Sequence, residues 1–490
     1  MPISWANERL GDRYLLLVSI VFTGLAVTGK GFAYLLPAPF FVSEVVMALG
    51  VYVVLRAGSI RSLFTLPQPW VMVAMFAWGA YRTLPYIPKY NIDAVRDAML
   101  FGYMTWAFVL GGLIVAKPER LNMIIKWFPK FVVIFLIACP IGLITYKFAG
   151  KSLPGYPWAP DISFVSIKAG DTCVILGMIM AFWVTGFMTN IRIIYLALLM
   201  MLLAFCGSIN RGGLLSFMTA MFLCMFCKPR SPWPWRVLGT LFVAMSLLFV
   251  TNVEIEVPGT PRTISFDQVI ENVLSIAGLS ENKNLGDTKE WRMAWWDTIF
   301  SYTLHGPYKW TGKGFGINLA DDDGFQVSIG EAELRSPHNA HMNILARSGV
   351  PGITLWVGVL ALWALQMGYC FLLSYHRRDG QWPNVFMWLG ATFAACCLNA
   401  SVDVYLEGPM GGVPMWTVYG VGLASMYLYK NKPHILRHPA EPIPLYADAS
   451  YDRYAPPRAS GPTRFFGPAP VARPAGKPAQ LAPFEDQSRN

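Results

Sequence analysis

Twelve apolar runs are spread along the first 430 residues and restrict what the chain can fold into. A helix that crosses the roughly 30 Å hydrocarbon core of a bilayer needs about 20 mainly apolar residues. Only 14% of the residues are charged, against about a quarter in an average soluble domain. We therefore predict an all-α polytopic membrane protein with about 12 transmembrane helices. The runs are 14–27, 37–55, 70–80, 98–116, 131–145, 172–188, 193–206, 214–227, 237–250, 353–373, 385–398 and 413–428.

The charges between the runs predict the orientation of the chain. Lys and Arg are concentrated in alternate connections, which lie on one side in a twelve-span count. The positive-inside rule makes that side cytoplasmic and puts both termini there. The net charge of +10 belongs largely to these connections and does not indicate binding to nucleic acid. The first run has no small-residue cleavage site after it, which favours a retained helix over a removed signal peptide.

The opposite, periplasmic face receives residues 147–171, 207–213 and 251–352. The last of these, between spans 9 and 10, mixes aromatic, glycine and charged residues. Long loops are uncommon unless they are functional or disordered, so we predict a folded, mainly helical and functional loop. Residues 1–430 then form one transmembrane domain that includes it.

The last part of the chain has a different composition. Residues 431–490 hold 12 of the 36 prolines and are predicted to be a disordered cytoplasmic tail. All eight cysteines lie in or beside apolar runs, which indicates neither a disulfide framework nor a zinc site.

Two arginines on the periplasmic face are candidate phosphate ligands. Arg211 lies in the polar segment 208–213 between two apolar runs. It is either a structural arginine at a helix end or a guanidinium that binds phosphate oxygens. Arg292 lies in an amphipathic segment, 290–296, where it is either a solvated charge or a second such ligand. The Gly-x-Gly-x-Gly run at 312–316 lacks the strand and helix of a nucleotide loop and is interpreted as a flexible turn.

Two of the chain's six histidines, His338 and His341, lie three residues apart just before the tenth run. Histidine is the side chain most readily used as a base near neutral pH. A metal site with Glu331 or Glu333 is the alternative, and we rank it well below the catalytic one because no cysteine is near.

These features resemble the O-antigen ligase and O-antigen polymerase superfamily of bacterial membrane glycosyltransferases. Three stretches carry the resemblance, and together they cover the family's usual core from about 100 to 428. They are the Arg-Gly turn at 208–215, the Arg292-x-x-x-Trp296 element with the Gly-rich run after it, and the His338-Asn339-x-x-x-Asn343-x-Leu345 to Gly349-x-x-Gly352 stretch. This chain departs from the family at Arg347, where an acidic residue is frequent, and at His341, where the residue is usually apolar. Asp403 matches a polar position that some ligases need.

The resemblance implies transfer of a glycan from an undecaprenyl-pyrophosphate carrier to a sugar hydroxyl, on the periplasmic face of the inner membrane. No nucleotide sugar, metal or other cofactor would be needed, and the anomeric configuration would invert. It implies that Arg211 and Arg292 bind the pyrophosphate. His338 would be the base, Asn339 would orient it, and His341 would be its substitute.

The acceptor is left open by the resemblance. A ligase uses lipid A core, as in lipopolysaccharide, whereas a polymerase uses another carrier-linked repeat, as in exopolysaccharide. A protein O-oligosaccharyltransferase of the same superfamily is one alternative. A carrier-lipid transporter is another, although the middle of each run is nearly free of charge, unlike a transporter's. A third is a non-catalytic partner of polysaccharide-assembly proteins that docks through the tail.

Overall fold

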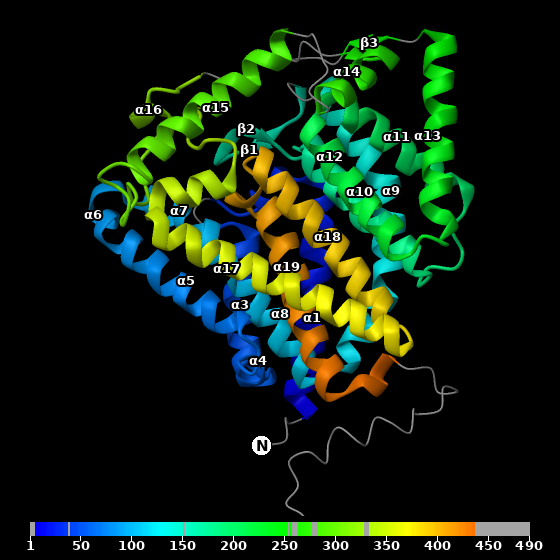
Figure 1. Cartoon of the computed structure of the whole chain (residues 1–490), viewed down its shortest axis with the longest axis horizontal. Coiled ribbons are helices and arrows are strands. Elements are labelled where there is room, and N and C mark those ends of the chain that lie inside the picture. The colour runs from blue at the N-terminus through cyan, green and yellow to red at the C-terminus, as the bar shows by residue number, and fades with distance from the viewer. Residues whose placement is uncertain are drawn as a thin grey trace, which may run out of the picture. The chain divides into compact units, whose positions relative to one another are not determined.

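The computed structural model describes residues 5–37, 40–149, 152–252, 254–256, 263–276, 283–327 and 333–436 (Figure 1). Most of the predicted tail, 437–490, lies outside these residues, as do parts of the predicted periplasmic loop and Glu331. Within them the structure is all-α apart from two short antiparallel hairpins, as the fold class predicted. β1 (Gly155–Tyr156) pairs with β2 (Ala159–Ser163), and β3 (Ile255–Glu256) pairs with β4 (Thr263–Ile264).

Each predicted run overlaps a helix, and the fourth run overlaps a bent pair of helices. The longer helices are α1 (Trp5–Thr28), α3 (Val42–Ala57), α5 (Gln68–Thr83), α7 (Ile92–Gly102), α8 (Thr105–Ala116), α9 (Glu119–Ala149), α10 (Ala169–Thr185), α11 (Ile193–Ile209), α12 (Arg211–Cys227), α13 (Pro232–Thr251), α14 (Phe266–Ile276), α15 (Lys283–Thr303), α17 (Ala340–Arg377), α18 (Trp382–Val402) and α19 (Pro409–Asn431). The short ones are α2 (Lys30–Ala33), α4 (Ile60–Leu63), α6 (Ile87–Tyr90), α16 (Leu319–Asp323) and the 3₁₀ helices η1 (Leu84–Tyr86), η3 (Tyr405–Glu407) and η4 (Pro433–Leu436).

Five helices in the described residues are long and apolar enough to cross a membrane: α1, α9, α13, α17 and α18. A sixth is added if α7 and α8, which meet at a bend of 40°, form one span. Helices α10, α11 and α12 are apolar but shorter. The structure thus has the helices of a multi-pass membrane protein, and the count of twelve stays a prediction.

Helix α10 is buried within the helical bundle. Nearly all of its side chains are buried, because it is apolar on every face and packs against both α12 and α18. Two glycines permit the approach of α10 to α12, since a Cβ added at Gly213 would lie 2.7 Å from the Cα of Gly170. Small residues at helix contacts let backbones come close in this way.

The Gly-rich run at 312–316 is a turn that is fixed to α17 by its backbone. Gly312 and Gly314 have φ of 62° and 88°, which glycine adopts without strain. The N–H of Lys313 donates to the Ala346 carbonyl at 2.8 Å, and that of Gly314 to the Arg347 carbonyl at 2.9 Å. Helix α17 itself breaks beside the turn at Gly349, whose φ is 67°. The turn therefore joins the loop to the foot of α17.

A buried ion pair holds the same region together. Arg347 and Asp97 have side-chain exposures of 1% and 9%, and Arg347 Nη1 lies 3.0 Å from Asp97 Oδ2. Arg347 Nε also donates to Asn343 Oδ1 at 2.7 Å. The departure from the family pattern at Arg347 thus has its counter-charge on α7. Removing one partner of a buried pair typically costs about 3–5 kcal/mol, because the other charge stays buried.

The anchored turn can be tested with alanine. Gly312→Ala should destabilise the protein more than Gly324→Ala, because both positions have positive φ but only the Cβ at 312 would collide with the Arg347 and Ser348 backbone. The shared backbone strain is about 1–2 kcal/mol. The measurement is thermal unfolding in detergent, followed by tryptophan fluorescence. Equal losses would mean that the turn is not held against α17.

Candidate active site

The end of α18 is a meeting point for elements that are far apart in the sequence. Gly170, at the start of α10, faces three polar side chains there: a Cβ added to it would lie 3.1 Å from Asn210 Nδ2, 3.2 Å from Asn399 Oδ1 and 3.5 Å from Asp403 Oδ2. These three side chains come from the segment before α12, from α18 and from the residue after α18. The ends of α10, α12 and α18 thus enclose a polar site.

His338 lies at this site and faces a carboxylate. Its Nδ1 is 3.7 Å from Asp403 Oδ1, which is within ion-pair distance but beyond a hydrogen bond, and the two side chains are 17% and 18% exposed. The Trp291 ring lies beside it, with ring centroids 6.5 Å apart. A histidine whose Nδ1 faces a carboxylate keeps Nε2 for a substrate proton.

Asp403 is held ionised by its surroundings. Burial raises the pKa of its carboxyl, but the contact with His338, the charge of Lys168 and the Val404 N–H outweigh burial and lower the pKa to about 2. The Val404 N–H donates to Asp403 Oδ1 at 2.8 Å. At neutral pH the residue is therefore a carboxylate that can fix the ring of His338.

Asn339 acts on His338 through the backbone. It is the N-cap of α17, and its Oδ1 accepts hydrogen bonds from the N–H groups of His341 at 2.9 Å and Met342 at 3.1 Å. Such a cap fixes the start of a helix. Asn339 can therefore orient His338 as predicted, because it fixes the start of α17 directly after His338.

His341 has both ring nitrogens engaged. Its Nδ1 accepts a hydrogen bond from Trp356 Nε1 at 2.9 Å, so the proton is assigned to Nε2, which lies 3.0 Å from Ser401 Oγ. Ser401 donates in turn to the Cys397 carbonyl at 2.9 Å. In this state His341 is a neutral link between α17 and α18, whereas His338 faces the polar site.

The two predicted arginines approach the same end of α18. Arg292 Nη1 donates to the Val402 carbonyl at 2.8 Å, one residue before Asp403. Arg211 is the first residue of α12, and a Cβ added to the following Gly212 would lie 2.6 Å from the Val402 side chain. Asn210 caps this helix by accepting from the Gly213 N–H at 2.8 Å. Both arginines are partly exposed.

The sequence pattern pointed to Asp403 but not to Lys168 or Asn399. Asn399 is fully buried, and its side chain lies beside the carboxyl group of Asp171. The available signal was position, since Asp403, Lys168 and Asn399 all stand at or near run ends that the predicted topology assigns to the periplasmic face. Among the described residues there is also no group of three or more His, Cys, Asp or Glu side chains placed to hold a metal ion.

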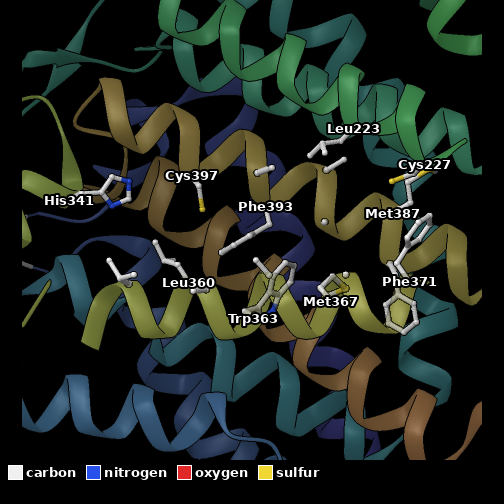
Figure 2. A pocket seen from close by; sticks show the side chains of 18 residues that line it. Leu223, Cys227, His341, Leu360, Trp363, Met367, Phe371, Met387, Phe393 and Cys397 are labelled. Carbon is white, nitrogen blue, oxygen red and sulfur yellow. The ribbon is translucent and has the colours of Figure 1, made fainter. Parts of the chain in front are cut away.

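An apolar groove of about 670 Å³ starts at His341 and follows α17 and α18 away from the site. Figure 2 shows His341 at one end, and Phe371 with Cys227 at the other. Trp363 and Phe393 line the middle. The groove is long and lined almost wholly by carbon and sulfur, so it suits an apolar chain.

The helices and the site define a multi-pass membrane protein with its polar chemistry gathered at one end of the bundle. Residues 196–357 match the family described as O-Antigen ligase. The chain thus carries a domain of the O-antigen ligase superfamily, which confirms the resemblance and supports a glycosyltransferase-like role in O-antigen ligation or polymerisation. No curated protein matches the chain significantly. The match includes Arg211, Arg292 and His338, but it ends before Asp403 and begins after Lys168.

Replacing His341 should destabilise the protein more than replacing His338. His341→Ala should destabilise the protein by about 1–3 kcal/mol, because Trp356 Nε1 loses a buried acceptor. His338→Ala should change the stability much less. The His338 ring contacts only the Asp403 carboxylate, at 3.7 Å, and the edge of the Trp291 ring. Thermal unfolding of both variants in detergent measures this. A larger loss for His338→Ala would contradict the role of His341 as the link.

Proposed function

We propose that the protein transfers a glycan from an undecaprenyl-pyrophosphate carrier to a sugar hydroxyl, as a ligase or polymerase of surface polysaccharide. The observation that carries the proposal is the pairing of His338 with ionised Asp403 beside two arginines. We further propose that the site faces the periplasm from the inner membrane. The family match supports the broad activity, and the site supports the mechanism.

The arginines would stabilise the leaving group. As the bond between the anomeric carbon and the phosphate oxygen breaks, the carrier pyrophosphate gains negative charge. Guanidinium groups donate paired hydrogen bonds to phosphate oxygens and stay protonated, so Arg211 and Arg292 can hold that charge without a metal ion. The Val402 carbonyl orients the Arg292 guanidinium for this role.

His338 would activate the acceptor. A sugar hydroxyl is a poor nucleophile, so a base assists its attack on the anomeric carbon. The acceptor oxygen forms the new bond to the anomeric carbon, its proton passes to His338 Nε2, and the carrier leaves as undecaprenyl pyrophosphate. Asp403 stabilises the imidazolium that results, as carboxylates do for histidine bases. Attack opposite the leaving group inverts the anomeric configuration.

The apolar groove would hold the polyprenyl tail of the donor. It begins at His341, which is three residues from His338, and it is bounded by α12, α17 and α18. A tail bound there brings the pyrophosphate to the arginine side of the site. This proposal links the lipid nature of the donor to a surface of this chain.

Transfer by the purified protein tests the catalytic assignment. The donor is an undecaprenyl-pyrophosphate-linked glycan with chelator present, and the acceptor is either lipid A core or a second carrier-linked repeat. His338→Ala should lower kcat by about 10²–10⁴. Arg211→Ala and Arg292→Ala should each lower it by about 10²–10³.

The matched controls are His376→Ala and Arg61→Ala, which are exposed residues elsewhere in the chain. They should keep the wild-type rate. Product on the core identifies a ligase, and a ladder on the carrier identifies a polymerase. Wild-type rates for all three site variants would refute the assignment.

An aromatic side chain introduced into the groove tests whether the polyprenyl tail binds there. Gly390→Phe should raise KM for the carrier-linked donor by about tenfold, because Gly390 lines the groove and a Cβ there would meet only Met367, at 3.8 Å. Gly239→Phe is the control, since Gly239 is an exposed helical glycine on α13 with nothing within 4 Å of an added Cβ. An unchanged donor KM for Gly390→Phe would place the tail elsewhere.

A further inference from the structure

The segment that follows Asp403 is fixed in the helical bundle. It forms the 3₁₀ helix η3, in which Tyr405 is buried. Helix α19 packs closely against it, since a Cβ added at Gly411 would collide with the Tyr405 carbonyl oxygen. Glu407, the last residue of η3, therefore extends from a fixed piece of backbone four residues after Asp403.

Glu407 accepts hydrogen bonds from both sides of His338. Its Oε2 accepts from Ser336 Oγ at 2.8 Å, and its Oε1 accepts from Asn343 Nδ2 at 2.7 Å. Ser336 lies two residues before His338, and Asn343 lies in the first turn of α17. Both donors are buried. One carboxylate thus joins the backbone before His338 and the helix after it to the segment that bears Asp403.

The orientation of the Asn343 amide is fixed by its other contact. Asn343 Oδ1 accepts from Arg347 Nε at 2.7 Å, so the amide nitrogen faces Glu407. Arg347 in turn pairs with Asp97 on α7. Glu407 is thus one end of a chain of polar contacts that runs through α17 to α7. Buried networks of this kind rigidify the elements that they join when their members are paired.

His338 depends on support from its surroundings. Its φ is 52°, a conformation that residues other than glycine rarely adopt. Its Nδ1 lies 3.7 Å from Asp403 Oδ1, so a small shift of either segment would separate the two groups. A misplacement of about 1 Å at a reacting group can slow an enzyme about a hundredfold.

We propose that Glu407 is a positioning residue, which holds His338 against Asp403. It acts through the hydrogen bonds that it accepts from Ser336 and Asn343. The role of His338 as the base rests on the proposed function. The effect of Glu407 on the place of the His338 ring does not.

The magnetic resonance signal of the His338 ring tests the positioning without any transfer reaction. Full-length protein in detergent is labelled with ¹³C in its imidazole rings, and His338→Ala identifies the His338 signal. Glu407→Ala should shift or broaden that signal, because two buried donors lose their acceptor. Glu407→Gln should leave it near its wild-type position, since the amide oxygen can accept from Asn343 while the amide N–H donates to the Ser336 hydroxyl. Glu119→Ala, which removes an exposed carboxylate at the start of α9, is the control.

Ser336→Ala is a milder variant for the same measurement. It removes one of the two hydrogen bonds without leaving a buried donor unpaired, and Glu407 keeps its contact with Asn343. It should shift the His338 signal in the same direction as Glu407→Ala, to a smaller degree. The test therefore does not depend on whether Glu407→Ala folds.

Transfer kinetics test the consequence for catalysis. Glu407→Ala should lower kcat by about a hundredfold. The donor KM should stay at its wild-type value, because Arg211 and Arg292 lie on other elements, and Glu407→Gln should recover most of the rate. Added to His338→Ala, Glu407→Ala should cause no further loss, because the base that it positions is already absent. A merely structural defect would add its loss to that of His338→Ala.

Two results would overturn the proposal. One is an unchanged His338 signal in both Glu407→Ala and Ser336→Ala. The other is a further loss of kcat when Glu407→Ala is added to His338→Ala, which would mean that Glu407 acts independently of His338. A His338→Ala protein that transfers at the wild-type rate would instead refute the base of the proposed function, and the ring signal would still decide whether Glu407 positions His338.

Discussion

The close packing of α10 against α12 and α18 is the contact on which the site depends. Helix α10 is apolar on every face, so it is stable only when protein or lipid surrounds it. Gly170 and Gly213 let it approach α12 so closely that Asn210, Asn399 and Asp403 meet around Gly170. Because glycine has no side chain, the two helices come close enough for three polar residues from distant parts of the sequence to share one site.

The sequence predicted the helices well because the bilayer fixes their length and composition. All twelve apolar runs overlap helices, and the candidate residues Arg211, Arg292 and His338 all approach the end of α18. The number of spans was harder to read. Helices α10, α11 and α12 are 17 residues each, near the lower limit of about 17 residues for a spanning helix.

Contacts between residues that are far apart in the chain could not be predicted from the sequence. Arg347 and Asp97 are 250 positions apart, so nothing local to Arg347 shows that its charge is matched on α7. His341 shows the same limit, because the pattern His338-x-x-His341 marks both rings as candidate bases. Only the fold brings Trp356 and Ser401 to the two nitrogens of His341 and leaves His338 as the ring that faces a carboxylate.

His338 also has a backbone conformation that no sequence pattern announces. Its φ is 52°, which costs a residue other than glycine about 1–3 kcal/mol. The neighbours supply the compensation: Asn339 caps α17, and Trp296 Nε1 donates to the Pro337 carbonyl at 3.1 Å. Such strain persists only where the surroundings fix it, and it is concentrated at functional sites. The loop helix that bears Arg292 thus also supplies Trp296, so one element positions both the arginine and the backbone of the candidate base.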